Sequence, residues 1–424
     1  AIDLTNVTTI STATMAEILE VVNNTGAVFT TAPNYAVTIS DTSSATNVNI
    51  VAGDTTGVVT ATIATGAVTA TLNAIGNVSV NDVITFTTND TTVDASDLVA
   101  LNAKVDTFGV NSIINITETY NATNVATEVV NALSITGNTK TVTITGGAIT
   151  ATDLNTIAGA TTGVVTATII TGAVTATLNA ITNVDVNDVI TFTTNDTTVD
   201  ASDLVALSAK VDNFTKTSIT GITEVYNTAN LTTVITNAIG LLDGNETIGI
   251  TGGAISASDT NTILNTTSGV VTATVTSGTA SSLNSALNDS GGQINALTLT
   301  ITDTTLASVD NLLALDTKTS VAVNASSVIS ITDTYSDLNT LYIAGNAGTI
   351  TGLGNEAVTI SDTQSATNVN TILGKTTGTV TATVSTDTAS NLNSALTNAT
   401  STDALTLTIT DTSLSSLTNL LALD

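Results

Sequence analysis

Two hydrophobic periods alternate along the chain. In residues 37–39 (VTI) and 297–301 (LTLTI), aliphatic side chains alternate with threonine, which predicts strands with one buried face and one hydroxylated face. The stretch after each strand changes period, and Leu98, Leu101 and Val105 follow one another at helical spacing. Each predicted helix spans only about ten residues, too few for a stable isolated helix. Its stability must therefore come from packing against its neighbours.

A long internal repeat is the clearest signal in the sequence. The segment 58–107 recurs at 164–213 with five differences, and the stretches SGVVTATV at 268–275 and TGTVTATV at 377–384 mark two more diverged copies. The repeated glycines Gly57, Gly163, Gly269 and Gly378 are 106, 106 and 109 residues apart. The predicted organisation is a partial unit at 1–36, repeat units at 37–141, 142–247 and 248–357, and a partial unit at 358–424.

Each unit of about 106 residues divides again into four pieces of 21 to 30 residues, all with the order strand, turn, short apolar helix. Such a piece cannot bury its own apolar face, and stacking on the pieces before and after it supplies the missing core. We therefore predict a repeat solenoid, specifically a right-handed parallel β-solenoid with short helices on one side of most rungs. About 16 rungs spaced by ~4.8 Å would form one continuous rod of about 75 Å.

The two ends of the chain are out of phase with the repeat. The first piece, 7–22, resembles the fourth piece of a unit, whereas 404–424 is a third piece. The start AIDLTNVTTIST can follow LLALD at 420–424 in nearly the register seen at 312–334, and neither end carries an atypical capping piece. This predicts either an excerpt of a longer array or subunits that join head to tail with other copies of themselves into a filament.

The composition excludes several kinds of catalytic and metal-binding chemistry. The 424 residues include no His, Cys or Arg, which excludes thiol and imidazole catalysis and the usual zinc, haem and iron–sulfur ligand sets. Only six lysines and a formal net charge of −29 argue against nucleic acid as a partner. The sequence contains no run of ~20 apolar residues, so membrane insertion is not expected. With 42% hydrophobic and only 10% charged residues the chain can still form a core, so disorder is not expected.

An acidic residue closes most of the predicted strands, usually before a threonine. These residues are Asp41, Asp90, Asp196, Asp303, Asp333, Asp362, Asp387 and Asp411, with Glu118 and Glu224 in the diverged fourth pieces. The preferred interpretation is helix capping, because carboxylates accept hydrogen bonds from the free N–H groups of a helix's first turn. Because the acids recur through every unit instead of forming one distinctive pair, no enzyme is predicted.

Calcium is the alternative interpretation of the same acids, because aligned carboxylates on adjacent rungs repel one another unless a cation lies between them. The weak candidate sites are Asp41, Asp90, Asp196, Asp303, Asp333, Asp362 and Asp411. The GGxGxD motif of calcium-binding nonapeptide repeats is absent. No other cofactor is expected.

The threonines on the outward strand face suggest a second kind of site. Flat rows of Thr-x-Thr can order water or contact a ligand such as ice or a surface glycan, although threonine is also simply a good strand former. The rows would consist of Thr60 and Thr62, Thr85 and Thr87, Thr166 and Thr168, Thr191 and Thr193, Thr381 and Thr383, and Thr406 and Thr408.

The segment 296–344, ALTLTITDTTLASVDNLLALDTKTSVAVNASSVISITDTYSDLNTLYIA, resembles the Asp-Thr-containing strand-helix repeats of very large bacterial extracellular proteins, namely adhesins, surface-layer proteins and repeats-in-toxin-type surface proteins. The resemblance extends over nearly the whole chain and implies an extracellular or cell-surface location and, often, calcium. We expect a structural protein that forms a rod, a surface layer or a filament; the alternative is an adhesin or ligand-binding module.

Overall fold

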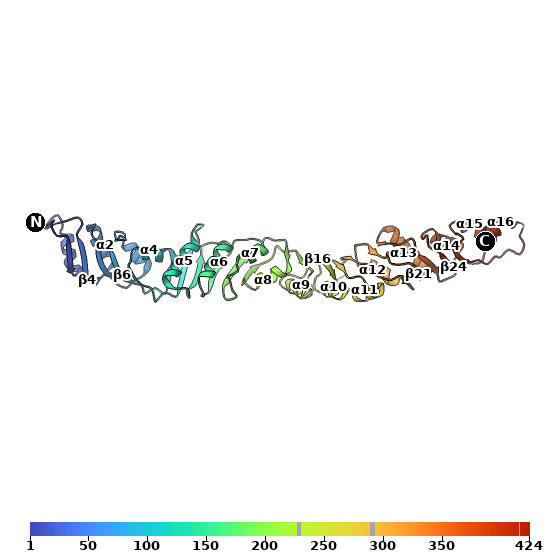
Figure 1. Cartoon of the computed structure of the whole chain (residues 1–424), viewed down its shortest axis with the longest axis horizontal. Helices are drawn as coiled ribbons and strands as arrows, with labels where there is room; N and C mark the ends of the chain where they lie inside the picture. The colour runs from blue at the N-terminus through green and yellow to red at the C-terminus, as the bar shows by residue number, and fades with distance from the viewer. Residues whose placement is uncertain (122, 227–229, 289–292, 415) are drawn as a thin grey trace. The chain divides into compact units, whose positions relative to one another are not determined.

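The chain forms an α/β fold of parallel sheets and short helices, compatible with the predicted repeat solenoid (Figure 1). The computed structural model describes residues 1–121, 123–226, 230–288, 293–414 and 416–424. Contacts divide it into two compact units: unit 1 consists of 1–196 and 206–217, and unit 2 of 197–205 and 218–424. We call each successive strand-helix piece a rung.

In unit 1 the described strands form three parallel sheets. The smallest pairs β1 (Ile2–Leu4) with β3 (Phe29–Thr31). The second has the order β2 (Thr9–Ala13), β4 (Ala36–Ser43), β5 (Val59–Ile63), β6 (Val83–Thr87), β8 (Thr107–Gly109). The third has the order β14 (Asn213–Thr215), β12 (Val189–Thr193), β11 (Val165–Thr168), β10 (Thr141–Thr145), β9 (Asn115–Thr119), β7 (Thr92–Asp94).

Unit 2 repeats this plan in its described part. One sheet has the order β13 (Thr198–Asp200), β15 (Gly221–Val225), β16 (Thr247–Ile255), β17 (Val271–Val275), β18 (Ala296–Thr298). The next has the order β19 (Thr305–Leu306), β21 (Ser330–Asp333), β23 (Ala357–Ile360), β24 (Val380–Thr383), β25 (Ala404–Thr406). A small sheet pairs β20 (Val323–Asn324) with β22 (Ile350–Thr351).

The helices are short, between five and thirteen residues. Unit 1 contains α1 (Met15–Asn23), α2 (Ala45–Asp54), α3 (Val68–Ala74), α4 (Ala95–Asn102), α5 (Val125–Thr136), α6 (Ala151–Ala160) and α7 (Val174–Ala180). Residues of both units contribute to α8 (Ala201–Ser208). Unit 2 contains α9 (Leu231–Gly240), α10 (Ala257–Leu264), α11 (Ala280–Ala286), α12 (Asp310–Asp316), α13 (Tyr335–Ala347), α14 (Ala366–Leu373), α15 (Ala389–Ala395) and α16 (Thr418–Ala422).

Several paired strands place side chains of the same type opposite one another. In unit 1 Val142 lies opposite Val165, and Thr143 lies opposite Thr166. Apolar strand residues such as Ile84 and the helical Leu98 are fully buried, so the core lies between the strands and the helices of each unit. In Figure 1, β4 and β6 of unit 1 follow one side and α2 and α4 the other. This is the arrangement that the alternating periods predict.

The third piece of a repeat unit carries two short strands, where one was expected. In unit 1, β6 extends the earlier sheet by pairing with β8, whereas β7 opens a new sheet by pairing with β9. The chain turns between them at Thr88, whose hydroxyl accepts from the N–H of Asp90 at 3.0 Å and donates to Gly66 O at 3.1 Å. The ladder is therefore divided into staggered sheets, and the three residues TVD of β7 are too few to show a strand period in the sequence.

The glycines that mark the repeat are required by close backbone approach. A Cβ on Gly163 would lie 2.3 Å from Lys140 O, a backbone atom that cannot swing aside. Thr161 fixes this approach, because its hydroxyl donates to Lys140 O at 2.6 Å and accepts from Gly163 N at 2.9 Å. Equivalent contacts below 2.5 Å recur at the other three repeated glycines, Gly57, Gly269 and Gly378.

Candidate functional site: carboxylates between rungs

The acid that follows a strand reaches back to the rung before it. Asp90 Oδ2 accepts from the N–H of Val68, the first residue of α3, at 2.7 Å, and Asp196 Oδ2 accepts from Val174 N of α7 at 2.7 Å. The partners are 22 residues apart, about one rung. The same contact joins Asp41 to Met15, Asp303 to Ala280, Asp333 to Val309, Asp362 to Tyr335, and Asp411 to Ala389, over 2.6 to 2.9 Å. We call these residues, with Glu118 and Glu224, the helix-start acids.

These contacts differ from ordinary capping, in which a residue serves its own helix. Some of the helices that a helix-start acid reaches already have a cap of their own; in α13, for example, Thr334 Oγ1 accepts from Asp337 N at 3.3 Å, whereas α3 and α7 have no side-chain cap. The helix-start acid from the next rung satisfies a further N–H of the first turn, a group that has no partner within its own helix. Each carboxylate therefore joins two rungs and also lies at the positive end of a helix dipole.

Asp387 is an exception among the predicted residues. Its Oδ1 accepts from Thr388 N and Asn391 Nδ2, both at 2.7 Å and both within its own rung. These hydrogen bonds, the one from Asn391 first, hold the pKa of Asp387 below its usual value. It serves the first turn of α15 locally and does not reach the preceding rung through these bonds.

Glu118 and Glu224 are the buried helix-start acids. Glu118 Oε2 accepts from Ser96 N at 3.0 Å, and Glu224 Oε2 accepts from Ser202 N at 3.1 Å. Burial, followed by repulsion from Asp94 and Glu128, raises the pKa of Glu118 to about 7. Burial, followed by repulsion from Asp200, also raises the pKa of Glu224. Perturbed carboxyls often mark active sites, but these two occupy equivalent cap positions in successive repeat units.

A second group of polar residues, which the sequence analysis overlooked, acts at the start of strands. Asp82 Oδ1 accepts from Val59 N at 2.7 Å, and Asp188 Oδ1 accepts from Val165 N at 2.8 Å, again across one rung. The others are Asp403 with Val380, Asn295 with Val271, Asp106 with Ile84, Asp212 with Ile190 and Thr319 with Leu297. Their signal was an Asp or Asn directly before a strand, or, for Thr319, a Thr four residues before one. We call the seven residues the strand-start group.

Three of the six lysines bind backbone carbonyls at or just after the C-terminal ends of helices. Lys104 Nζ donates to Val78 O at 2.7 Å, just beyond the end of α3, and Lys318 Nζ donates to Asn284 O of α11 at 2.8 Å. Lys210 Nζ donates to Val184 O after α7. A cation at the carbonyl end of a helix complements its dipole. Acids and lysines thus hold the two ends of helices in the preceding rung.

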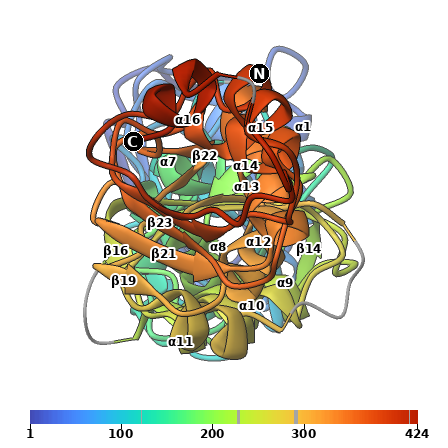
Figure 2. The same ribbon diagram turned by 90° about the vertical axis from the view of Figure 1, so that its right-hand side faces the viewer.

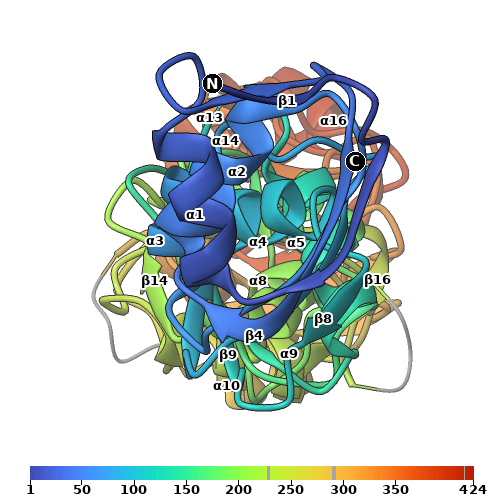
Figure 3. The ribbon, with the colours of Figure 1, turned by 90° about the vertical axis from the view of Figure 1, so that its left-hand side faces the viewer.

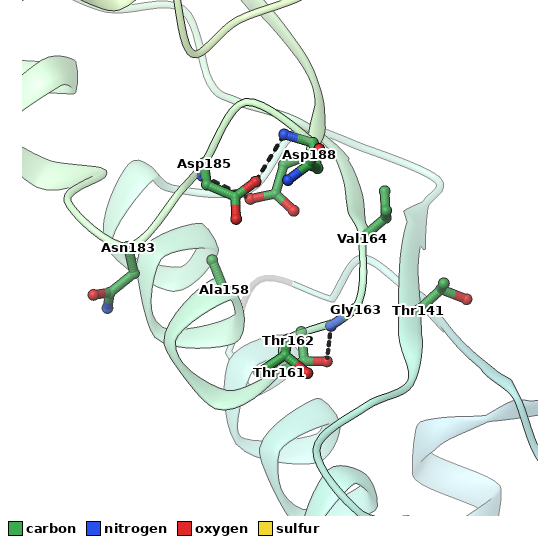
Figure 4. A pocket seen from close by; sticks show the side chains of 10 residues that line it. Thr141, Ala158, Thr161, Thr162, Gly163, Val164, Asn183, Asp185 and Asp188 are labelled. Carbon is green, nitrogen blue, oxygen red and sulfur yellow. Dashed lines mark hydrogen bonds between the residues drawn. The ribbon is translucent and has the colours of Figure 1, made fainter.

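One cavity in unit 1 measures about 380 Å³ (Figure 4). Asn183, Asp185 and Asp188 line one side of it, and Thr161 and Thr162 belong to the preceding rung. Asp188 is already engaged, because its Oδ2 accepts from Asp185 N at 3.0 Å and its Oδ1 from Val165 N. The cavity is a polar gap between two rungs, which Asp188 connects through Val165 N, while the bond from Asp185 N lies within one loop.

The calcium interpretation gains no support from this geometry. Within the described ranges, no three acidic side chains form a group that could hold a metal ion. The predicted calcium residues instead accept backbone N–H groups one by one, as given above. No helix in the described part of the chain is long and apolar enough to span a bilayer.

Threonines align in short columns on the outer strand face. In unit 1, Thr62 lies opposite Thr85, which lies opposite Thr107. The neighbouring column is interrupted, because Thr60 lies opposite Val83. In the next sheet Thr143 lies opposite Thr166, which lies opposite Val189. The structure therefore brings some predicted threonines together, but in columns broken by exposed valines.

No protein-family model matches the chain, and no curated protein matches it.

Proposed function

We propose that the protein is a structural repeat protein whose role is to form a stacked rod, surface layer or filament. The observation that supports this most is the use of the recurring acids, which accept backbone N–H groups of the preceding rung at 2.6 to 3.1 Å. Carboxylates occupied in this way are not poised for catalysis. We therefore also propose that the protein is not an enzyme and needs no cofactor.

The finer architecture belongs to the same proposal. We infer a right-handed solenoid of about 16 rungs, continuous through all four repeat units and about 75 Å long. Support comes from the parallel strand register within each unit, where partner residues lie 20 to 27 residues apart. In such a rod, load along the axis would be shared by strand hydrogen bonds, apolar stacks and the charged helix-end contacts.

The proposed location is extracellular or at the cell surface. Support comes from the composition and from the resemblance to strand-helix repeats of large bacterial surface proteins. An acidic, threonine-lined exterior with a net charge of −29 would discourage lateral clumping of rods. Proposed partners are other copies of the chain, or further repeats of the same kind.

An adhesin or ligand-binding module is the second candidate, with ice, a surface glycan or calcium as ligand. Such a face needs a flat and unbroken array. The threonine columns of unit 1 are favourable over Thr62, Thr85 and Thr107 but are interrupted by Val83 and Val189. The acids lack a metal-binding grouping among the described residues. The structural role is therefore better supported.

Electron microscopy of the purified chain tests the proposed function. We expect unbranched rods whose shortest members measure about 75 Å, with the same appearance in calcium and in EDTA. Compact particles without an elongated axis would contradict the solenoid, and rods that form only in calcium would favour the calcium-dependent alternative.

A further inference from the structure

A short strand closes one sheet edge inside unit 2. There β22 pairs in parallel with β20, and Val323 lies opposite Ile350. Val323 N donates to Thr349 O at 2.8 Å. Ala325 N donates to Thr351 O at 2.8 Å, and Thr351 Oγ1 donates to Val323 O at 3.4 Å. Figure 2 labels β22 beside α13, against which it packs. Val323 and Ala325 are fully buried as a result.

The strand β8 of unit 1 occupies the same place in its repeat unit as β20. Thr88 N donates to Gly109 O at 3.0 Å. At the equivalent strand position, Ile301 N donates to Asn324 O at 3.0 Å. The matched pairs are Phe108 with Val323, Gly109 with Asn324, and Val110 with Ala325. By this equivalence the N–H groups of Phe108 and Val110 point away from β6, toward the outer edge of the sheet.

The outer edge of β8 is open, unlike that of β20. In the described ranges β8 is the last strand of its sheet, and β6 is the strand that pairs with it. The ring of Phe108 packs on the buried Phe86, with 5.7 Å between the ring centroids. Phe108 and Val110 are nevertheless partly exposed, because nothing covers them as β22 covers their counterparts. In Figure 3, β8 lies on the side of unit 1 away from α1 and α3.

The connection that follows the next helix explains this difference. In unit 2 the connection between α13 and β23 spans residues 348–356 and contains β22. In unit 1 the corresponding connection between α5 and β10 spans only residues 137–140. Four residues extend over at most about 14 Å, which is too short to form a strand beside β8 and also return to β10. A strand for this edge must therefore come from elsewhere.

A lysine closes the corresponding edge at β14, which ends its sheet in the described part of unit 1 as β8 does. Phe214 and Lys216 take the positions of Phe108 and Val110. Lys216 Nζ donates to Phe214 O at 3.3 Å and lies 4.7 Å from the centre of the Phe214 ring. In β20 the equivalent carbonyl faces β22. Because a lysine on an edge strand opposes pairing, the same edge is filled in β20, blocked in β14 and open in β8.

We propose that the outer edge of β8 binds an extended segment of a partner protein by strand addition. The segment would run parallel to β8, accept the N–H groups of Phe108 and Val110, and place an aliphatic side chain against the exposed part of the Phe108 ring. Main-chain hydrogen bonds supply the affinity in this mode of binding, and the alternating side chains supply the selectivity. The site is additional to the proposed structural role and does not depend on it.

The chemistry of the partner segment follows from β22 and from the charge of the chain. Residues 349–351 alternate threonine with a β-branched aliphatic residue, and this pattern fits the equivalent edge. The net charge of −29 favours a segment without acidic residues. Described strands with this alternation, such as β10 and β22, already pair within their own sheets. A partner protein is therefore favoured over a second copy of the chain.

Fluorescence anisotropy with a labelled peptide tests the site. The probe is GTITGLG, residues 348–354 with blocked ends, and the unaltered 424-residue chain should bind one peptide. Val110→Lys copies the blocked edge of β14 and should weaken binding about tenfold or more. Lys216→Val copies the open edge of β8 and should raise the stoichiometry to two peptides per chain. Val186→Lys adds the same charge at a side chain 74% exposed in the loop before β12, and this control should bind as the unaltered chain does. A peptide carrying Ile350→Asp should not bind.

Hydrogen exchange locates the bound peptide, because the amides of Phe108 and Val110 should exchange more slowly in its presence. Several outcomes would overturn the site: no saturable binding, equal binding to the Val110→Lys variant, one peptide per chain in the Lys216→Val variant, or unchanged exchange at the two amides. Self-association of the unaltered chain that Val110→Lys abolishes would assign the edge to a second copy instead. Each variant carries a side chain that the chain itself uses at the equivalent position, and circular dichroism verifies that both are folded.

Discussion

Asp188 offers the sharpest test of the idea that polar side chains hold one rung to the next. It is buried, and its two carboxylate oxygens accept from Val165 N in the preceding rung and from Asp185 N in its own loop, at 2.8 and 3.0 Å. Asp188→Ala leaves both N–H groups without this acceptor. Each hydrogen bond onto a charged acceptor is worth roughly 1.5–3 kcal/mol, and because neighbouring losses do not add fully we expect about 3 kcal/mol.

The chain itself indicates the matched conservative variant. Asn295 stands in the same role in the next repeat unit, where its Oδ1 accepts from Val271 N at 2.9 Å. Asp188→Asn should therefore keep the bond to Val165 and lose only the one to Asp185, at a cost of about 1 kcal/mol. Asp185→Ala removes the same charge from an exposed position and should cost less than about 0.5 kcal/mol.

Urea unfolding and native-state hydrogen exchange of the Val165 amide are the assays. The Ala variant should lower the unfolding midpoint and raise exchange at Val165 on the order of 100-fold, the equivalent of about 3 kcal/mol. Equal stabilities of Asp188→Ala and Asp185→Ala would show that the inter-rung hydrogen bond contributes nothing beyond charge removal, and would refute the reasoning.

Three further predictions follow from the same contacts. Gly163→Ala forces a Cβ to 2.3 Å from Lys140 O and should lower the free energy of unfolding in urea by about 3 kcal/mol. In the control Gly172→Ala the new Cβ would lie 3.7 Å from Thr177 Oγ1, and stability should hardly change. Similar losses of stability at both sites would contradict the close-approach argument. The pKa of Glu118 is raised to about 7, so the folded state binds a proton on this carboxyl more tightly than the unfolded chain does. The stability that the protonated carboxyl contributes is therefore fully present below about pH 4.5 and is lost as the pH rises through 7. Glu118→Gln should make the thermal midpoint less dependent on pH between pH 5 and 8. If the variant's midpoint changes with pH as that of the unaltered chain does, Glu118 is not the titrating group. Addition of EDTA should leave the thermal midpoint of the unaltered chain within about 1 °C, whereas a fall of several degrees would point to calcium between the rungs.

The periodicity of the sequence was sufficient to predict the element order. Strand residues alternate with period two and helix residues recur at three and four, and both sets are buried as predicted; Ile84 of β6 and Leu98 of α4 are examples. Parallel pairing followed from the length of the rungs, because a connection of about twenty residues suits a crossover rather than a hairpin. The second strand in the third pieces was missed, since β7 has only three residues, too few to show a period.

The partners of the acids could not be predicted from the sequence. An Asp after a strand and before a helix suggests that it caps that helix, yet Asp90 contacts α3 in the rung before. The choice depends on the alignment of neighbouring rungs in space, which the order of residues along one rung does not contain. The strand-start residues escaped notice for the same reason: Asp188 resembles an ordinary turn residue until Val165 is seen beside it.

The most direct test of the central claim is hydrogen exchange at the first residue of each helix. The amide of a helix's first residue has no partner within the helix and normally exchanges freely. The account predicts that the amides of Val68, Val174 and Ala280 are protected in the folded chain, because each donates to a carboxylate of the following rung at 2.7 Å. Exchange of these three amides at the rate of an unstructured chain would contradict the claim that the recurring acids connect the rungs.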